Sequence, residues 1–110
     1  MTGIPKKVRD LVSVRAQGRC EGCGGYADLE LHHRKFRSRG GQHTASNLIA
    51  LCGWGNHTGC HGKAHSAEPP RGWALRSWQT PDLEPFLSFE GLVWLTVDGR
   101  RVLVGEEPNF

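Results

Sequence analysis

Four cysteines and six histidines, all within the first 65 residues, are the sequence feature that most limits how this chain can fold. The chain has 110 residues, which is the size of one domain, or of one domain with a tail. A protein of this length buries only about two-thirds of its unfolded surface, and 37% of these residues are hydrophobic. A core this small benefits from a metal cross-link, for which cysteine and histidine are the usual ligands.

The cysteines are better explained as metal ligands than as disulfides. No hydrophobic run approaches the ~20 residues that a transmembrane helix needs. The charged residues 1–7 lack the apolar segment and cleavage site of a signal peptide. We therefore expect a cytoplasmic protein with no membrane partner. Cysteines stay reduced in that compartment, where they bind metals more often than they pair.

Positive charge is concentrated in the same part of the chain. Residues 1–65 contain ten lysines and arginines against four acidic residues, a net charge of +6, whereas residues 66–110 carry −3. Because lysine and arginine release counterions when they contact phosphates, this asymmetry favours a nucleic acid as the partner. The alternative is an ordinary solvated basic face.

Local patterns predict a helix followed by a hairpin. Residues 4–17 have hydrophobic side chains at helical spacing, and Gly18 is expected to end the helix. Residues 28–34 alternate between apolar and polar side chains, as in a half-buried strand, and the apolar residues 47–52 are long enough for a second strand. The basic, glycine-containing residues 34–46 between them are expected to form a hairpin loop.

The remaining chain is predicted to contain a short helix and a C-terminal extension. Residues 60–65 form the helix, which completes a core at residues 1–68. Residues 69–110 begin with two prolines, become acidic and aromatic, and are assigned to packing or partner docking. Within them, residues 91–104 predict a β-hairpin with a two-residue turn at Asp98-Gly99.

The four cysteines form two pairs, Cys20 with Cys23 and Cys52 with Cys60. Zinc binds four thiolates in a tetrahedron, so the two pairs predict one structural Zn²⁺. A lone Cys-x2-Cys is also a redox motif, and a thiol protein is the alternative, but a second pair about 30 residues later favours zinc. The gap between Cys52 and Cys60 leaves room for His57 to replace one cysteine.

The remaining functional candidates are four histidines and one asparagine: His32, His33, Asn47, His61 and His65. His61 and His65 are four residues apart, which places both on one face of a helix. Together with His32, these neutral imidazoles can hold a divalent ion and leave positions open for water and phosphate. His33 points to the opposite face of its strand, where it is free to accept a proton as a general base. A pair of surface histidines, or a second structural zinc, is the alternative.

The order of these motifs resembles that of the HNH endonuclease family. The resemblance covers about residues 8–66, through Gly-Arg-Cys-Glu-Gly-Cys, Leu-Glu-Leu-His-His-Arg, Ser-Arg-Gly-Gly, Ser-Asn-Leu, Leu-Cys and Cys-His-Gly-Lys-Ala-His. It implies an α+β protein with a small zinc-stapled ββα-metal fold, an N-terminal helix and a C-terminal β-hairpin. It also implies that Asn47 hydrogen-bonds across the hairpin loop and so directs His33. The departure from the family pattern is the long segment at residues 53–59.

The resemblance implies a metal-dependent DNA endonuclease with His33 as general base. One divalent ion, Mn²⁺, Mg²⁺, Ni²⁺ or Zn²⁺, is expected at the histidines, and double-stranded DNA is the expected partner. Residues 69–110 are loosely similar to the C-terminal segments of actinobacterial and phage members of the family. This similarity adds a phage terminase as a further expected partner and the bacterial host cytoplasm as the expected location. The alternative is a non-catalytic zinc-dependent DNA-binding module, although such a module has no need of His33 beside His32.

Basic side chains near the histidines are the expected phosphate contacts. They lie in the hairpin loop and the short helix: Arg34, Lys35, Arg37, Arg39 and Lys63. The net-acidic residues 69–110 are expected to make no DNA contact, and His43 and His57 are expected to be ordinary loop residues. Because few residues beyond the core are left to read base edges, we expect little sequence specificity.

Overall fold

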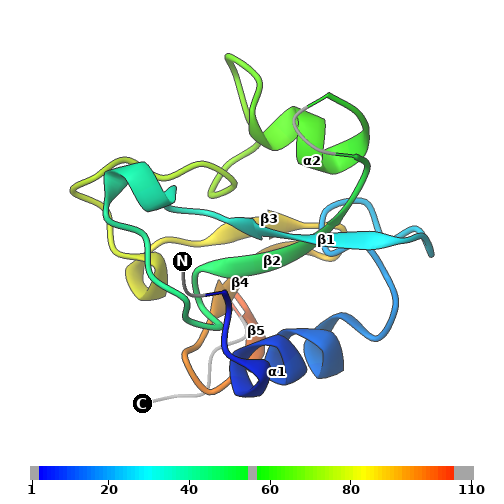
Figure 1. Cartoon of the computed structure of the whole chain (residues 1–110), viewed down its shortest axis with the longest axis horizontal. Helices are drawn as coiled ribbons and strands as arrows, with labels where there is room; N and C mark the ends of the chain where they lie inside the picture. Colours follow the sequence, from blue (N-terminus) through cyan, green and yellow to red (C-terminus); the bar gives the residue numbers. More distant parts are fainter. Residues whose placement is uncertain (1–2, 55–56, 106–110) are drawn as a thin grey trace.

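The computed structural model describes residues 3–54 and 57–105. In chain order its elements are α1 (Lys6–Ala16), β1 (Leu29–His33), η1 (Arg37–Arg39), β2 (Leu48–Cys52), α2 (Gly59–Ala64), η2 (Pro81–Leu83), β3 (Phe86–Ser88), β4 (Gly91–Leu95) and β5 (Arg101–Leu103). The strands form two antiparallel sheets, β1-β2 and β3-β4-β5. Helices α1 and α2 lie on opposite sides of the β1-β2 hairpin (Figure 1). This small α+β architecture confirms the predicted fold class.

Helix α1 is slightly shorter than the helix predicted at residues 4–17. It begins directly after Pro5, whose fixed φ suits a helix start. It ends where Gln17 adopts a left-handed conformation with φ of 52°, one residue before the predicted stop at Gly18. Its inner face contains the fully buried Val12. No helix in the described part of the chain is long and apolar enough to cross a bilayer.

The predicted hairpin forms, and its strands differ from the predicted ranges by about one residue at each end. β1 pairs with β2 from Leu29 opposite Cys52 to His33 opposite Leu48. The loop between the strands was expected to be irregular, but it contains the 3-10 turn η1, which ends at Gly40 with φ of 89°. A left-handed residue at this position closes the turn, and glycine adopts that conformation without strain.

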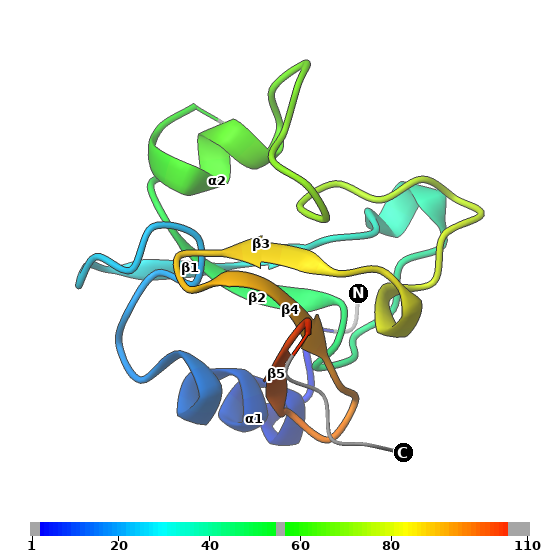
Figure 2. The ribbon, with the colours of Figure 1, turned by 180° about the vertical axis from the view of Figure 1, so that it is seen from behind.

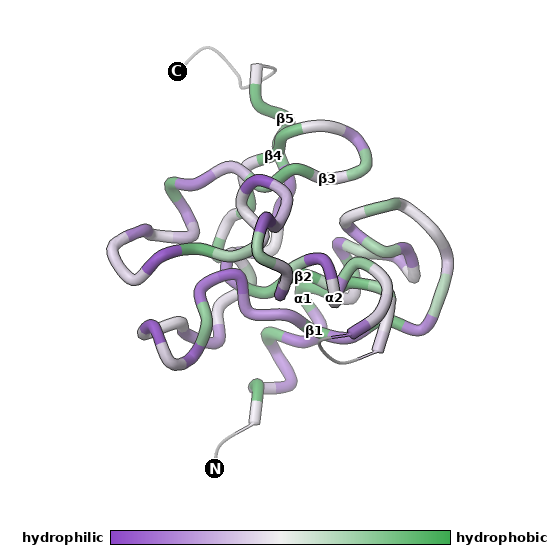
Figure 3. Tube along the Cα trace, turned by 90° about the horizontal axis from the view of Figure 1, so that it is seen from above, coloured by the Kyte–Doolittle hydropathy of each residue, from purple (hydrophilic) through white to green (hydrophobic). Residues whose placement is uncertain are grey.

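Strand β2 is buried on both faces, which explains its uninterrupted run of apolar residues. Leu48 and Ala50 belong to the hydrophobic cluster that includes α1. Ile49 and Leu51 belong to a second cluster on the other face of the strand. Figure 3 shows hydrophobic stretches along β2 and along the C-terminal strands, with hydrophilic loops around them. The strand that ends at Cys52 is therefore fixed from two sides.

A buried ion pair anchors α1 to the hairpin. The Nε–H of Arg15 donates to a carboxylate oxygen of Glu21 at 2.7 Å, and both side chains are almost fully buried. The other guanidinium nitrogens donate to the carbonyls of Ala45 and Leu48, while Glu21 accepts the N–H of Ala50. Because every polar group of the pair has a partner, the charges are tolerated in the core. This pair fixes the chain next to the first cysteine motif.

The C-terminal extension shares one hydrophobic core with the N-terminal part of the chain. In the view of Figure 2, β3 and β4 lie across the β1-β2 hairpin. The shared cluster consists of Cys20, Ile49, Leu51, Cys60, Ala64, Trp73, Phe86, Val93 and Leu95. The indole of Trp73 lies so close to Gly22 that a Cβ on that glycine would be 2.4 Å from a ring carbon. Residues before and after position 68 are thus buried against each other.

The C-terminal sheet differs from the predicted two-stranded hairpin. It has a third strand, β3, and the turn between β4 and β5 is not the predicted two-residue turn. Arg100 and Thr96 still pair, so the loop contains three residues, 97–99. Gly99 takes φ of 88° at the end of this loop and donates its N–H to the Thr96 carbonyl. The Asp-Gly dipeptide was correctly placed in a turn, but Val97 enters the turn as well.

Candidate metal centres and nuclease site

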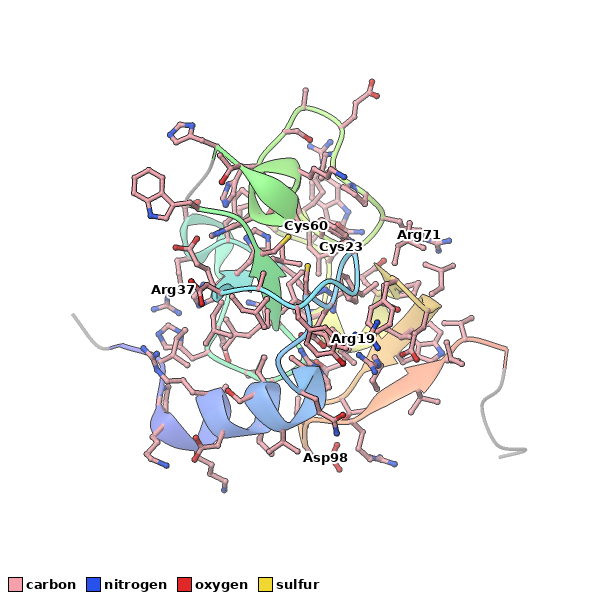
Figure 4. All side chains as sticks on the ribbon, turned by 90° about the vertical axis from the view of Figure 1, so that its right-hand side faces the viewer. Arg19, Cys23, Arg37, Cys60, Arg71 and Asp98 are labelled. Atoms are coloured by element: carbon pink, nitrogen blue, oxygen red, sulfur yellow. The ribbon has the colours of Figure 1, made fainter. Side chains whose placement is uncertain are left out.

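The four cysteines converge from three separate elements. Cys20 and Cys23 lie in the turn before β1, Cys52 ends β2, and Cys60 lies in α2. All four sulfur atoms are within 4.8 Å of one another, and those of Cys23 and Cys52 are 3.8 Å apart. Figure 4 shows the sulfurs of Cys23 and Cys60 turned toward each other. Four free thiols at this separation fit a tetrahedral zinc centre, and His57, the alternative ligand, is not part of the cluster.

The backbone around the cluster prepares one sulfur for metal binding. Burial raises the pKa of Cys20, but backbone N–H groups, including that of Cys23 at 3.4 Å from the sulfur, outweigh it and lower the pKa to about 7. Burial, together with the neighbouring Cys20, raises the pKa of Cys60. Metal binds the thiolate form, so the lowered pKa of Cys20 prepares this sulfur as a ligand. A bound cation would also favour the thiolate form of Cys60.

Three predicted metal-ligating histidines also converge. His32 comes from β1, His61 from α2, and His65 follows α2 directly. Each offers a ring nitrogen within 4.8 Å of the others, and their ring centroids are 5.0–5.1 Å apart. The donors are all imidazole nitrogens, a set that suits Zn²⁺, Ni²⁺ and related ions. The structure therefore brings together the three residues whose spacing suggested a catalytic ion.

Hydrogen bonds on the outer side of this cluster determine which ring nitrogen faces inward. Nε2 of His32 lies 2.7 Å from the carbonyl oxygen of Trp73, and Nδ1 of His61 lies 2.8 Å from a carboxylate oxygen of Glu30. Since these oxygens only accept, both nitrogens carry the hydrogen. Nδ1 of His32 and Nε2 of His61 are left with lone pairs for a metal, an arrangement typical of protein metal sites.

Burial favours the neutral form of His32 and His65. It is the main cause that lowers the pKa of His32 to about 4, with the Trp73 carbonyl opposing it in part. Burial also lowers the pKa of His65, and the nearby His61 adds to this effect. A neutral imidazole binds a cation, whereas a protonated one repels it. The cluster is therefore ready to bind a metal at neutral pH.

His33 lies beside this cluster but is not part of it. It lines the same cavity of about 170 Å³ as His32, His61 and His65. Burial lowers the pKa of His33, and the charges of His43 and Arg37 act in the same direction. A neutral histidine next to a metal centre can accept a proton from water.

His43, expected to be an ordinary loop residue, is a partner of His33. Its Nδ1 lies 3.0 Å from Nε2 of His33. The other ring nitrogen of His43 is buried and has no hydrogen-bond partner within the described chain. Nothing in the local sequence could reveal this pair, because the two residues are joined by an irregular loop of nine residues with no repeating pattern.

Asn47 closes the loop that carries His43. Its side-chain oxygen accepts the N–H of Lys35 at 2.7 Å, while its side-chain nitrogen donates to the carbonyls of Lys35 and Gln42. The asparagine is completely buried. Its three bonds hold the two ends of the loop together immediately after His33, which is the cross-loop bonding that the family resemblance implies.

The basic residues predicted to contact phosphate fall into two groups. Lys35 is half-buried, whereas Arg37, Arg39 and Lys63 are exposed, and Arg37 lines the histidine cavity. Arg34 is different, because it is completely buried and donates to four backbone carbonyls. The prediction that it contacts DNA is therefore wrong: an arginine on the edge of a hairpin is enclosed here by the C-terminal extension.

A β-hairpin and a short helix around three histidines, next to a four-cysteine centre, define the class of small ββα-metal proteins. The model of the HNH endonuclease family matches residues 20–67, a range that contains all seven clustered cysteines and histidines. Residues 20–67 are thus similar to the HNH endonuclease family. Searches of curated proteins and of solved structures returned no match for the chain.

Proposed function

We propose that this protein is a metal-dependent endonuclease that hydrolyses phosphodiester bonds in double-stranded DNA. The observation that carries the proposal is the histidine cavity, in which three imidazoles can share one ion while His33 stands outside the ligand set. A site that only stabilises the fold needs ligands but no neutral histidine beside them. The four-cysteine centre, whose Cys60 is the neighbour of His61 in α2, would serve that structural purpose.

Each histidine then has a separate role. His32, His61 and His65 would hold the ion, which supplies positive charge to stabilise the negative charge developing on the phosphate and the leaving oxygen. His33 accepts a proton from the attacking water. Because Nε2 of His33 faces His43, Nδ1 is the nitrogen left to take that proton. The products then carry a 5′-phosphate and a 3′-hydroxyl, as the family resemblance implies.

The proposal extends to the ions, the location and the partner. Structural Zn²⁺ fits the cysteines, and Mn²⁺, Ni²⁺ or Zn²⁺ fits the histidines better than Mg²⁺, which prefers oxygen ligands. Four free thiols fit a cytoplasmic location, that of the bacterial host if a phage encodes the protein. A role in phage genome packaging, with a terminase as partner, rests on the loose similarity of residues 69–110 to phage members of the family.

Plasmid cleavage tests the proposal directly. Zinc-loaded protein is incubated with supercoiled plasmid and Mn²⁺ or Mg²⁺, with wild type, His33→Ala and His57→Ala in parallel. Because a general base contributes ~10²- to 10⁴-fold in rate, His33→Ala should lose nearly all activity. His57, an exposed histidine outside both clusters, is the matched control and should remain active.

Two outcomes would contradict this function. Cleavage by His33→Ala at the wild-type rate would show that another group is the base. DNA binding by the wild type without cleavage in either Mn²⁺ or Mg²⁺ would instead identify a zinc-dependent DNA-binding module.

A further inference from the structure

A second groove begins where the histidine cavity ends. It has a volume of about 240 Å³, and its wall includes Phe36 and His65, which also line the histidine cavity. Two arginines, Arg39 and Arg76, line the groove, and no acidic side chain does. Arg76 belongs to the C-terminal extension, for which the sequence predicted no contact with DNA. The groove is therefore a positively charged continuation of the site, built from both halves of the chain.

Arg39 is held in place by its neighbours. Its guanidinium carbon lies 4.6 Å from the centre of the Phe36 ring, and that ring stacks on His65 with centroids 5.0 Å apart and an interplanar angle of 26°. One guanidinium nitrogen donates to the carbonyl of Leu75 at 3.0 Å. The remaining donors of this planar group are left for an anion, at little entropic cost because the side chain is already ordered.

Arg76 follows Leu75 directly and presents an uncommitted charge. Its backbone N–H donates to the side chain of Gln79 at 2.7 Å, which fixes the start of the side chain. Its guanidinium carbon lies 5.9 Å from the exposed ring of Trp78. Among the described residues, no carboxylate forms an ion pair with Arg76. An exposed guanidinium beside a second one, with no acid to neutralise either, attracts anions.

We propose that this groove binds a phosphodiester of the substrate strand next to the one at the histidine cavity, with Arg39 and Arg76 as its ligands. The inference rests on the proposed nuclease function. A DNA strand carries one phosphate per 3.4 Å of helix axis, so a strand that enters the histidine cavity must place further phosphates on the adjoining surface. Guanidinium groups bind phosphate through two parallel hydrogen bonds, and two of them line this path. The ring of Phe36, which lines both the groove and the histidine cavity, provides an apolar surface for the intervening sugar.

DNA binding measured without turnover tests the groove. In a His33→Ala background, fluorescence anisotropy of one labelled duplex is recorded from 50 to 300 mM salt in the presence of Mn²⁺, and the slope of log affinity against log salt is determined for each variant. Arg76→Ala should lower the affinity and reduce the slope of log affinity against log salt by about 0.9, the value for one lost phosphate contact. Arg76→Lys should keep the slope, because it keeps the charge. Combining Arg76→Ala with Arg39→Ala should reduce the slope by about 1.8.

Arg71→Ala is the matched control, because Arg71 is an exposed arginine of the same extension that does not line the groove. Figure 4 shows it on the side of the molecule away from Arg37. Equal slopes for Arg76→Ala and Arg71→Ala would overturn the inference, as would a wild type that binds no DNA. A wild type that fails to cleave while Arg76→Ala still reduces the slope would refute only the nuclease function.

Discussion

Replacing Arg34 is the sharpest test of how the two halves of the chain are joined. Its guanidinium donates to the carbonyls of Gly72, Ser46, Pro81 and Glu84 at 2.7–3.0 Å. Three of these four acceptors belong to the C-terminal extension. Arg34→Ala would remove all four bonds and leave the carbonyls without their donor.

The expected loss of stability can be worked from these contacts. Hydrogen bonds from a charged donor contribute about 1.5–3 kcal/mol each, or about 6–12 kcal/mol for four. Burial, with a smaller effect of the Arg15 charge, lowers the pKa of Arg34 from 12.5 to about 10. This decrease of about 2.5 pKa units corresponds to a cost of about 3 kcal/mol for keeping the side chain charged. Subtracting this cost from the contribution of the four bonds leaves about 3–9 kcal/mol. Because water can reach the half-buried carbonyls in the variant, we expect the lower part of this range, about 3–5 kcal/mol. That is a large part of the ~5–16 kcal/mol available to a domain of this size.

Thermal and urea unfolding of zinc-loaded protein, followed by circular dichroism, would measure this loss. A decrease of 3–5 kcal/mol corresponds to a melting temperature lowered by about 12–20 °C. Arg37→Ala is the control, because Arg37 is exposed and makes one hydrogen bond, to the carbonyl of Gly41. That variant should lose less than about 1 kcal/mol. If Arg34→Ala melted within 2 °C of the wild type, the four bonds would not hold the extension in place and the reasoning would fail.

Three further predictions concern the metal centres and the proposed base. Stripping zinc from the cysteines should unfold the domain, because structural zinc contributes ~10–16 kcal/mol in small folds; unchanged circular dichroism and melting would contradict this. Burial lowers the pKa of His32 to about 4 in the folded protein, so on acidification the unfolded chain binds a proton at this residue before the folded one does. The free energy of unfolding should therefore be unaffected by His32 above about pH 6.5. It should fall by up to about 3 kcal/mol as the pH drops to 4. Urea titrations across this range should show a smaller fall for His32→Gln, and equal falls would exclude His32 as the cause. His43→Ala should lower kcat by about 10- to 100-fold at unchanged KM, because the His33 ring loses its hydrogen-bond partner. His43→Asn should restore part of the activity, because its side-chain oxygen can replace Nδ1 as the acceptor. Long-range ¹H–¹⁵N spectra that show the same His33 tautomer in the wild type and both variants would contradict this role.

The metal ligands were predictable because the sequence spacings that define them are local. His61 and His65 are one helical turn apart, and a hairpin necessarily brings the ends of its strands together. Glu30, the partner of His61, was predictable as well, because it lies two residues before His32 on the same face of β1. Alternation along a strand was the available signal for it.

The contacts that could not be predicted join residues far apart in the chain. The acceptors of Arg34 lie 12, 38, 47 and 50 residues away, and no local pattern distinguishes an arginine that will be covered by a later segment from one that will face DNA. The same limit applies to Arg76, whose position beside the histidine cavity depends on the path of the extension. The net charge of the extension does not indicate where Arg76 lies, because it sums over side chains that face different parts of the molecule.

Trp73 gives the two metal centres an order of assembly. Its indole lies on Gly22, between the first two cysteines, and donates its N–H to the carbonyl of Leu87. Its own carbonyl holds the ring of His32. Without zinc, the cysteine turn that packs on the indole is held only by its hydrogen bonds and by the Arg15–Glu21 pair. The position of Trp73, and with it the ring of His32, is then less firmly fixed. We therefore expect zinc to bind at the cysteines first and the histidines to bind their ion tightly only afterwards, so that the proposed nuclease activity would depend on the supply of zinc.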